Sequence, residues 1–500
     1  MKIDQFPEDI RSYIQPEAAG QMYYRCLGCN NLFDINELLY TCPECGTVLL
    51  LEDTGFERYD HIDGPTWQKI FDYRKMLNNQ PVKGIFRYYE FIAPVIPLEY
   101  IIYLGEGHTP VVQANDRLKK MVGRDFYFKD DGLNPSASFK DRGMACALSF
   151  INYFASKNKI DKILAICAST GDTSAAAALY ASYLKDFLKS AVLLPEGKVT
   201  AQQLAQPLGS GAKVLEIPGV FDDCMKIVES LTENYHVALL NSKNSWRILG
   251  QESYSYEIAQ DFDYDVSDKV IILPIGNAGN ITAVMSGFLK FYKAGVIKSL
   301  PKIIGVQSEH ADPVYRYYLE KDPDKRVWQP VNVKSSVAQA AMIGNPVSMP
   351  RVIKIADEYN KTSPEKRIFV VQVTEQEIMD SMIIANRNGN VVCTQGGESL
   401  AGMKKAVDTG LIENHETGVL DSTAHMLKFL SFQEKYFNNT FEPEFKVIPR
   451  EELKNLPSLV RPERLDKYPE PGRPLQGKDM ERFVEIMSSE IAKILELEKK

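Results

Sequence analysis

Short apolar runs alternate with amphipathic stretches over residues 126–425. The runs are FYFKD, KILAIC, AVLLP, KVLEI, VALLN, KVIILPIG, IIGVQ and IFVVQV. After the first run, Met144, Leu148, Ile151 and Ala155 mark one face of a helix. Further helices are expected near 173–185, 199–207, 221–234, 248–260 and from about 280. Buried parallel strands read as near-continuous apolar runs, so the pattern predicts an α/β fold with helices on both faces of a parallel sheet. Ligands of such sheets bind at the carboxyl ends of the strands.

The two ends of the chain differ from this alternation. Five regions are expected: an N-terminal arm 1–21, a cysteine-containing ribbon 22–52, an aromatic and proline-rich wrap 53–100, a catalytic region 101–435 and a C-terminal extension 436–500. The extension is rich in proline and ends in a charged helix from about Lys478. Packing of this helix on the body, packing on a partner chain and a solvated tail all stay open. A chain of 500 residues exceeds one ordinary core, so two or more packed units are expected.

Composition narrows the class of protein. The chain is 44% hydrophobic and 25% charged, with a net charge of −8, which are values of a globular protein without the basic surface of most nucleic-acid binders. No apolar run reaches the length of a membrane span, and the start MKIDQFPEDIRSY has no secretory h-region. We therefore expect a cytoplasmic protein that binds neither nucleic acid nor membrane and can form a homodimer.

Four of the eight cysteines form a metal-binding pattern. Cys26 and Cys29 make one C-x-x-C pair, Cys42 and Cys45 make another, and twelve residues separate the two pairs. Two such knuckles can direct four thiolates to one tetrahedral centre, so the spacing predicts a structural Zn²⁺ ribbon. A pair of redox-active C-x-x-C motifs and a relic that no longer binds metal are the alternative interpretations.

A lysine opens a helix after a turn in the string LNPSASFKDRG, residues 133–143. Asn134-Pro135 predicts the turn, Ser136 and Ser138 offer hydroxyls, and Lys140 begins the helix. Burial at such a position lowers the pKa of an amine, which can then condense with an aldehyde. Arg142 is expected to form a structural ion pair.

A second loop fits a phosphate. Gly276, Asn277, Ala278, Gly279 and Asn280 follow an apolar strand and precede a helix. Small residues at a helix N-terminus let several N–H groups converge on an anion. The string is not G-x-G-x-x-G, so a dinucleotide site is not expected.

The string NPSASFKDRG resembles the Schiff-base motif of the fold type II, tryptophan-synthase-β-like enzymes, which use pyridoxal 5'-phosphate. Cys167–Ser174 resembles the substrate loop of that family, 276–280 its phosphate loop and Asp421–Lys428 its pyridine-side loop. The resemblance implies two parallel-rich α/β subdomains with the cofactor in the cleft between them. It also implies that the cofactor is held by Lys140, Asp172, the 276–280 loop and Thr423.

Within this family, the sequence is similar to those of threonine synthases. The matching strings are GIFRYYE at 84–90, LGEGHTP at 104–110, the segment with Asn241, Ser242 and Arg247, and IGNPVS at 343–348. The resemblance implies that O-phospho-L-homoserine and water become L-threonine and phosphate, with Lys140 as the catalytic amine. The expected substrate-binding residues are Thr109, Ser138, Ser169, Thr170, Asn241 and Arg247.

Two other functions stay open from the sequence. One is a different lyase of the same fold, such as a cysteine or cysteate synthase that acts on O-phosphoserine. The other is a zinc-ribbon scaffold whose catalytic region is inactive. Three positions differ from the usual threonine synthase strings: Asp172, NPSA at 134–137 and TQGGES at 394–399. These differences affect the assignment of the substrate more than the assignment of the cofactor.

Overall fold

The chain forms two compact units, Met1–Ile448 and Pro449–Lys500. The computed structural model describes residues 1–168, 171–184, 187–196, 201–218 and 221–499. Among these residues no helix combines the length and the apolar character that a bilayer crossing requires. The finer domain boundaries stay predictions.

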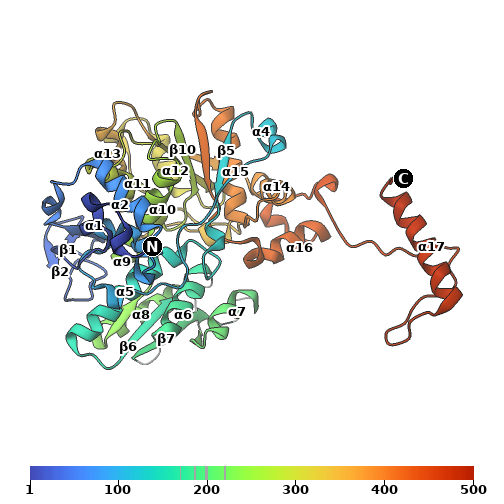
Figure 1. The fold of residues 1–500 in the computed structure, drawn as a ribbon, viewed down its shortest axis with the longest axis horizontal. Helices are drawn as coiled ribbons and strands as arrows, with labels where there is room; N and C mark the ends of the chain where they lie inside the picture. Colours follow the sequence, from blue (N-terminus) through green and yellow to red (C-terminus); the bar gives the residue numbers. More distant parts are fainter. Residues whose placement is uncertain (169–170, 185–186, 197–200, 219–220, 500) are drawn as a thin grey trace. The chain divides into compact units, whose positions relative to one another are not determined.

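A six-stranded sheet forms the larger half of the first unit (Figure 1). Its order is β12-β11-β10-β13-β5-β4, and every neighbouring pair is parallel except β5 and β4. The strands are β4 (Val111–Gln113), β5 (Phe126–Lys129), β10 (Lys269–Pro274), β11 (Lys302–Ser308), β12 (Ile368–Val373) and β13 (Thr417–Asp421). Because β10 and β11 are buried along almost their whole length, nearly all of their residues are apolar.

A four-stranded parallel sheet forms the smaller half. Its order is β8-β7-β6-β9. The strands are β6 (Ile163–Ala168), β7 (Leu188–Pro195), β8 (Lys213–Ile217) and β9 (Val237–Leu239). β9 is a short edge strand. The two sheets confirm the predicted α/β fold with two parallel-rich subdomains.

Helices cover both sheets. α6 and α8 pack on the small sheet, α15 packs on the large one, and α5 packs against both α6 and α9. The helices of this region are α4 (Asp116–Val122), α5 (Lys140–Asn158), α6 (Asp172–Tyr183), α7 (Ala201–Gly209), α8 (Phe221–Asn234), α9 (Ser245–Gln251), α10 (Ser253–Asp261), α11 (Gly279–Lys293), α12 (Pro313–Leu319), α13 (Met349–Thr362), α14 (Glu375–Arg387), α15 (Thr394–Asp408) and α16 (Leu430–Asn438).

The N-terminal hundred residues pack on this body. After α1 (Glu8–Ile14), the strands β1 (Met22–Cys26), β2 (Leu32–Asp34) and β3 (Leu49–Asp53) form an antiparallel sheet of order β2-β1-β3. α2 (Gly64–Arg74) and α3 (Tyr89–Ile92) follow. Phe71 stacks on Phe291 of α11 with centroids 5.6 Å apart, so the aromatic residues of the wrap join the main core.

The second unit contains the charged helix expected near the C-terminus. This helix, α17 (Gly477–Ile494), has no buried residue, and Val484, Ile491 and Ile494 are exposed.

Two local features differ from the sequence pattern. The helix expected over 248–260 begins earlier, at Ser245, because the Asn244 side chain accepts hydrogen bonds from the N–H groups of Trp246 and Arg247. It is also two helices, α9 and α10, which meet at Glu252. The antiparallel edge strand β4 has only three residues and was not expected.

Candidate active site

The motif segments gather at the carboxyl ends of parallel strands. In the large sheet, β5, β13 and β10 are neighbours, and they lead into the segments with Lys140, Thr423 and Gly276. In the small sheet, β6 and β9 are neighbours, and they lead into the segments with Asp172 and Arg247. This is the edge at which parallel sheets bind ligands.

The loop before Lys140 is fixed by its backbone. Phe139 N donates to Thr423 O at 2.9 Å, and His425 N donates to Ala137 O at 3.1 Å. Ala137 has a φ of 64°, which produces the sharp turn that aims Lys140 at the start of α5. The Lys140 and Thr423 segments therefore lie side by side, although the sequence separates them widely.

The Lys140 side chain is partly buried and lies in an electrostatically mixed environment. Its Nζ is 4.2 Å from the centroid of the Phe139 ring and forms no hydrogen bond with any described residue. Burial, reinforced by the nearby Arg247 cation, lowers its pKa to about 8, against the opposing charges of Asp172 and Asp421. An amine with this pKa is still mostly protonated near physiological pH, but its neutral, nucleophilic fraction is far larger than that of an ordinary lysine.

An ion-pair network anchors the first turn of α5. The Arg142 guanidinium is bidentate to Asp131 at 2.7 Å and also pairs with Glu257 at 2.7 Å. This confirms the structural ion pair expected for Arg142. Thr109, predicted to bind substrate, uses its hydroxyl in this network: it donates to Asp131 at 2.7 Å and accepts from Arg142 at 3.1 Å.

The 276–280 segment forms an open helix terminus. Ala278 is the N-cap of α11 with a φ of 60° and no side-chain cap, so the first N–H groups of the helix have no capping acceptor. A Cβ at Gly276 would lie 3.0 Å from Ala341 Cα, which explains the small residue. Asn280 Nδ2 donates to Asp421 Oδ2 at 2.7 Å, which ties the loop to the end of β13.

Arg247 is a buried cation without an acidic partner in the described part of the chain. Only 2% of the residue is exposed, and within the described part of the chain its side chain makes one hydrogen bond, from Nη1 to Leu240 O at 3.1 Å. Its Nε is buried and unpartnered, and burial lowers the pKa of the guanidinium to about 10. Asn241 lies beside this segment, half-buried, with its Oδ1 accepting from Lys243 N at 2.8 Å. An uncompensated guanidinium needs an anion, so this geometry favours a phosphate or carboxylate ligand.

Asp172 at the start of α6 pairs with a lysine that the sequence analysis did not select. Lys428 Nζ is 3.1 Å from Asp172 Oδ1 and donates to Ser136 O and Gln206 Oε1, both at 2.8 Å. Lys428 belongs to the string DSTAHMLK, in which the sequence predicts a cofactor-binding role for Thr423 and not for Lys428. The cation thus joins α6 and α7 of the small-sheet half to the loop that carries Lys140.

Several hydroxyl groups around Lys140 lack partners. Ser136, Ser138 and Ser422 are buried, and their Oγ atoms form no hydrogen bond with any residue that the structure describes. Thr423 is 4% exposed, and its Oγ1 lies 3.5 Å from Cys393 Sγ. The predicted residues Ser169 and Thr170 lie outside the described residues. Buried hydroxyls without partners are unfavourable unless a ligand satisfies them.

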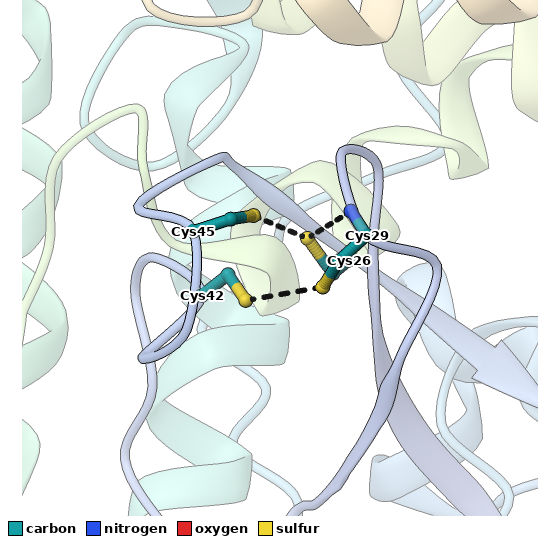
Figure 2. A group of neighbouring side chains, drawn as sticks. All are labelled: Cys26, Cys29, Cys42 and Cys45. Carbon is teal, nitrogen blue, oxygen red and sulfur yellow. Dashed lines mark hydrogen bonds between the residues drawn. The ribbon is translucent and has the colours of Figure 1, made fainter.

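The four clustered cysteines converge on one point (Figure 2). Their sulfur atoms all lie within 4.8 Å of one another. Cys26 Sγ is 3.3 Å from Cys45 Sγ, and Cys29 Sγ is 3.6 Å from Cys42 Sγ, so each close pair joins the two knuckles. A Cβ at Gly28 would lie 3.0 Å from Cys45 Sγ, so the tight knuckle requires glycine. The cluster can hold a metal ion.

Comparisons with known proteins agree with this geometry. The family described as pyridoxal-phosphate dependent enzyme matches residues 102–421. Threonine synthase from Methanocaldococcus jannaschii is 34% identical over 409 residues, which cover 81% of this chain and 93% of the relative. The chain belongs to the threonine synthase family of pyridoxal-phosphate dependent enzymes. Threonine synthase from Methanosarcina acetivorans is 36% identical over 411 residues, 81% of this chain and 92% of the relative.

The fold also matches a solved member of this family. The crystal structure of threonine synthase from Escherichia coli aligns with a TM-score of 0.61 at 20% identity, over 85% of this chain and 95% of that chain. This match supports the fold, and the family assignment rests on the sequence relatives. The predicted resemblance is therefore confirmed.

Proposed function

We propose that the chain is a threonine synthase, which converts O-phospho-L-homoserine and water to L-threonine and inorganic phosphate. The observation that carries the proposal is the pair of cationic groups at the carboxyl edge of the sheets. Arg247 is a buried guanidinium without an acidic partner in the described ranges, and it is close enough to Lys140 to lower the pKa of the amine. A phosphorylated amino acid supplies an anion for the first group and a reacting carbon for the second.

The residues present fit pyridoxal phosphate. Lys140 would carry its aldehyde carbon, and the uncapped N–H groups that follow Ala278 would hold its phosphate. Thr423 would face the pyridine nitrogen, where a hydroxyl, unlike a carboxylate, does not force the nitrogen to stay protonated. Asp172, held by Lys428, would lie beside the ring hydroxyl. Unpartnered Ser138 then offers a donor to the cofactor or to the substrate carboxylate.

Bound pyridoxal phosphate supplies a conjugated ring that withdraws electrons from the substrate Cα. The Lys140 amine, with its lowered pKa, takes the proton from Cα as a general base and passes that proton to the bound ring. The amine is then neutral again and takes a second proton, from Cβ. Phosphate leaves from Cγ into the reach of Arg247 and Asn241. The two protons return to Cγ and Cα, water adds its hydroxyl to Cβ, and the other proton of that water ends on the released phosphate. Thr109 is not assigned to phosphate, because Asp131 and Arg142 already engage its hydroxyl.

The cysteine cluster is proposed to hold a structural Zn²⁺. Four thiolates at about 2.3 Å from a tetrahedral ion stand about 3.8 Å apart, close to the separations of 3.3 and 3.6 Å. The close sulfur pairs lie between the knuckles and not within each C-x-x-C, which disfavours two separate redox pairs. Four protein ligands close the coordination sphere, so this metal stabilises the ribbon.

Product analysis tests the proposed function. The purified, cofactor-loaded chain is mixed with O-phospho-L-homoserine, and released phosphate and new amino acid are measured together. We expect equal amounts of phosphate and threonine. Lys140→Ala is expected to lose activity by about 10³-fold or more, while the matched exposed variant Lys361→Ala keeps it.

Two results would contradict the proposal. Phosphate release from O-phosphoserine but not from O-phosphohomoserine would favour a cysteine or cysteate synthase. Failure to bind pyridoxal phosphate at all would favour the inactive scaffold.

A further inference from the structure

Arg351 of α13 is a second buried arginine without an acidic partner in the described ranges, but all its donors are occupied. The residue is fully buried, and burial lowers the pKa of its guanidinium to about 9. Nε and Nη2 donate to Leu49 O at 2.9 and 2.7 Å. The remaining three hydrogen bonds, each 2.9 Å, run to Ser242 O, Ser348 Oγ and Lys243 O. A guanidinium has five N–H donors, so none is left for a ligand.

The acceptors belong to three segments that are far apart in the sequence. Leu49 begins β3 of the cysteine ribbon, and Ser242 and Lys243 lie in the segment between β9 and α9, just before the first turn of α9, which contains Arg247. Ser348 N donates to Asn277 O at 3.2 Å, within the 276–280 loop. The Arg351 side chain therefore connects the ribbon directly with the segment before Arg247. Through Ser348 it is also connected to the proposed cofactor-phosphate loop.

The ribbon contacts the Arg247 segment at further points. Tyr40 Oη donates to Val237 O at 3.0 Å and accepts from Leu239 N at 2.9 Å, which occupies backbone groups of the edge strand β9. Ser245 Oγ donates to Leu49 O at 2.9 Å, and Trp246 Nε1 donates to Tyr24 Oη at 3.0 Å. The ribbon therefore contacts both β9 and the start of α9, on either side of residues 240–244.

This support is needed because β9 is short and the segment that follows it is irregular. Three residues of strand give few ladder hydrogen bonds, so contacts from outside help the local hydrogen bonds to define the path from residue 240 to the first turn of α9 at Arg247. Arg247 lies within this path, and a displacement of about 1 Å of a ligand-binding group can weaken its effect by about 10²-fold. Arg351 donates hydrogen bonds to the carbonyl groups of both Ser242 and Lys243, just before α9 begins.

We infer that Arg351 is a positioning residue: it ties the 241–247 segment to the cysteine ribbon and so places Arg247 for the substrate phosphate. The inference rests on the proposed function for the identity of that phosphate. Arg351 itself touches no ligand, because its five donors all end on the protein. The ribbon is then a support for substrate binding as well as an N-terminal module.

The test compares Arg351→Lys with a matched control. Lysine keeps the charge but lacks the planar fork that spans several carbonyls. Arg74→Lys is the control, because Arg74 is also buried and uses five hydrogen bonds, none of them to a segment with a proposed site residue. Bound pyridoxal phosphate, kcat, KM for O-phospho-L-homoserine and amide hydrogen exchange of residues 237–247 are measured for each.

Arg351→Lys is expected to raise KM about 10-fold or more, with kcat changed less than about 3-fold and cofactor content unchanged. Exchange of 237–247 should become faster in this variant and stay unchanged in Arg74→Lys. Ser245→Ala, a milder change on the ribbon contact, should shift KM and exchange in the same direction by less. It also keeps the test decisive if the arginine variant does not fold.

The inference is overturned if KM stays constant in Arg351→Lys and Ser245→Ala, or if Arg74→Lys gives the same split between KM and kcat. Unchanged exchange of 237–247 would overturn it as well. A wild-type chain that does not act on O-phosphohomoserine would instead refute the proposed function, and the exchange comparison would still decide whether Arg351 orders this segment.

Discussion

Replacing Arg247 by Met should weaken substrate binding without weakening the fold. The guanidinium is buried without an acid in the described ranges, and its pKa of about 10 corresponds to roughly 3 kcal/mol of stability lost on burying the charge. The native state holds this proton less tightly than the unfolded chain. The cost is therefore present at every pH below about 10 and is relieved as the pH rises above that value.

The substitution removes this cost together with one hydrogen bond to Leu240 O, worth about 1 kcal/mol. The net change in the free energy of unfolding is expected to lie between about 0 and 2 kcal/mol in favour of the variant. A lost charge-assisted hydrogen bond to phosphate, about 1.5–3 kcal/mol, should raise KM by roughly 10–150-fold.

Urea denaturation and steady-state kinetics measure the two effects, and Arg142→Met provides the contrast. Arg142 is equally buried but pairs with Asp131 and Glu257, so its loss should destabilise the fold by about 3–5 kcal/mol. Equal destabilisation by both variants, with KM unchanged in Arg247→Met, would refute the assignment of Arg247 to an anionic ligand.

Three further predictions address other parts of the account. Lys428→Met leaves the Asp172 carboxylate without its cation and should lower kcat/KM on the order of 10-fold, whereas the more exposed Lys435→Met should not. Because the neutral amine of Lys140 reacts, the rate of pyridoxal phosphate uptake by the cofactor-free chain should rise with pH, with a midpoint near 8. Lys428→Met should move that midpoint upward. A rate independent of pH between 6 and about 10 would contradict the lowered pKa. Metal analysis should find one Zn²⁺ per chain, and Cys42→Ser should release it and lower the melting temperature; full metal content in this variant would exclude the four-thiolate site.

The sequence predicts the strands and the site-bearing loops well for a physical reason. Parallel strands buried on both faces, such as β10 and β11, must be apolar throughout, and their carboxyl ends must meet at one edge. The Lys140 and 276–280 segments follow such strands, so their proximity could be expected from the pattern. The strand β4 is too short to give a pattern of its own.

Partners distant in the sequence could not be predicted in the same way. Arg351 and Ser242 are 109 residues apart, and nothing around either residue indicates a hydrogen bond between them. The pairing of Lys428 with Asp172 likewise appears only after the two sheets come together. For Thr109 the sequence motif predicted a substrate-binding hydroxyl. In the structure this hydroxyl instead forms hydrogen bonds with Asp131 and Arg142.

The most direct test of the central claim is to locate the cofactor on the chain. The loaded protein is reduced with borohydride, which fixes pyridoxal phosphate to its lysine, and the peptides are mapped by mass spectrometry. The account predicts the label on Lys140, with its loss in Lys140→Ala. A label on Lys428 or another lysine, retained in Lys140→Ala, would contradict it.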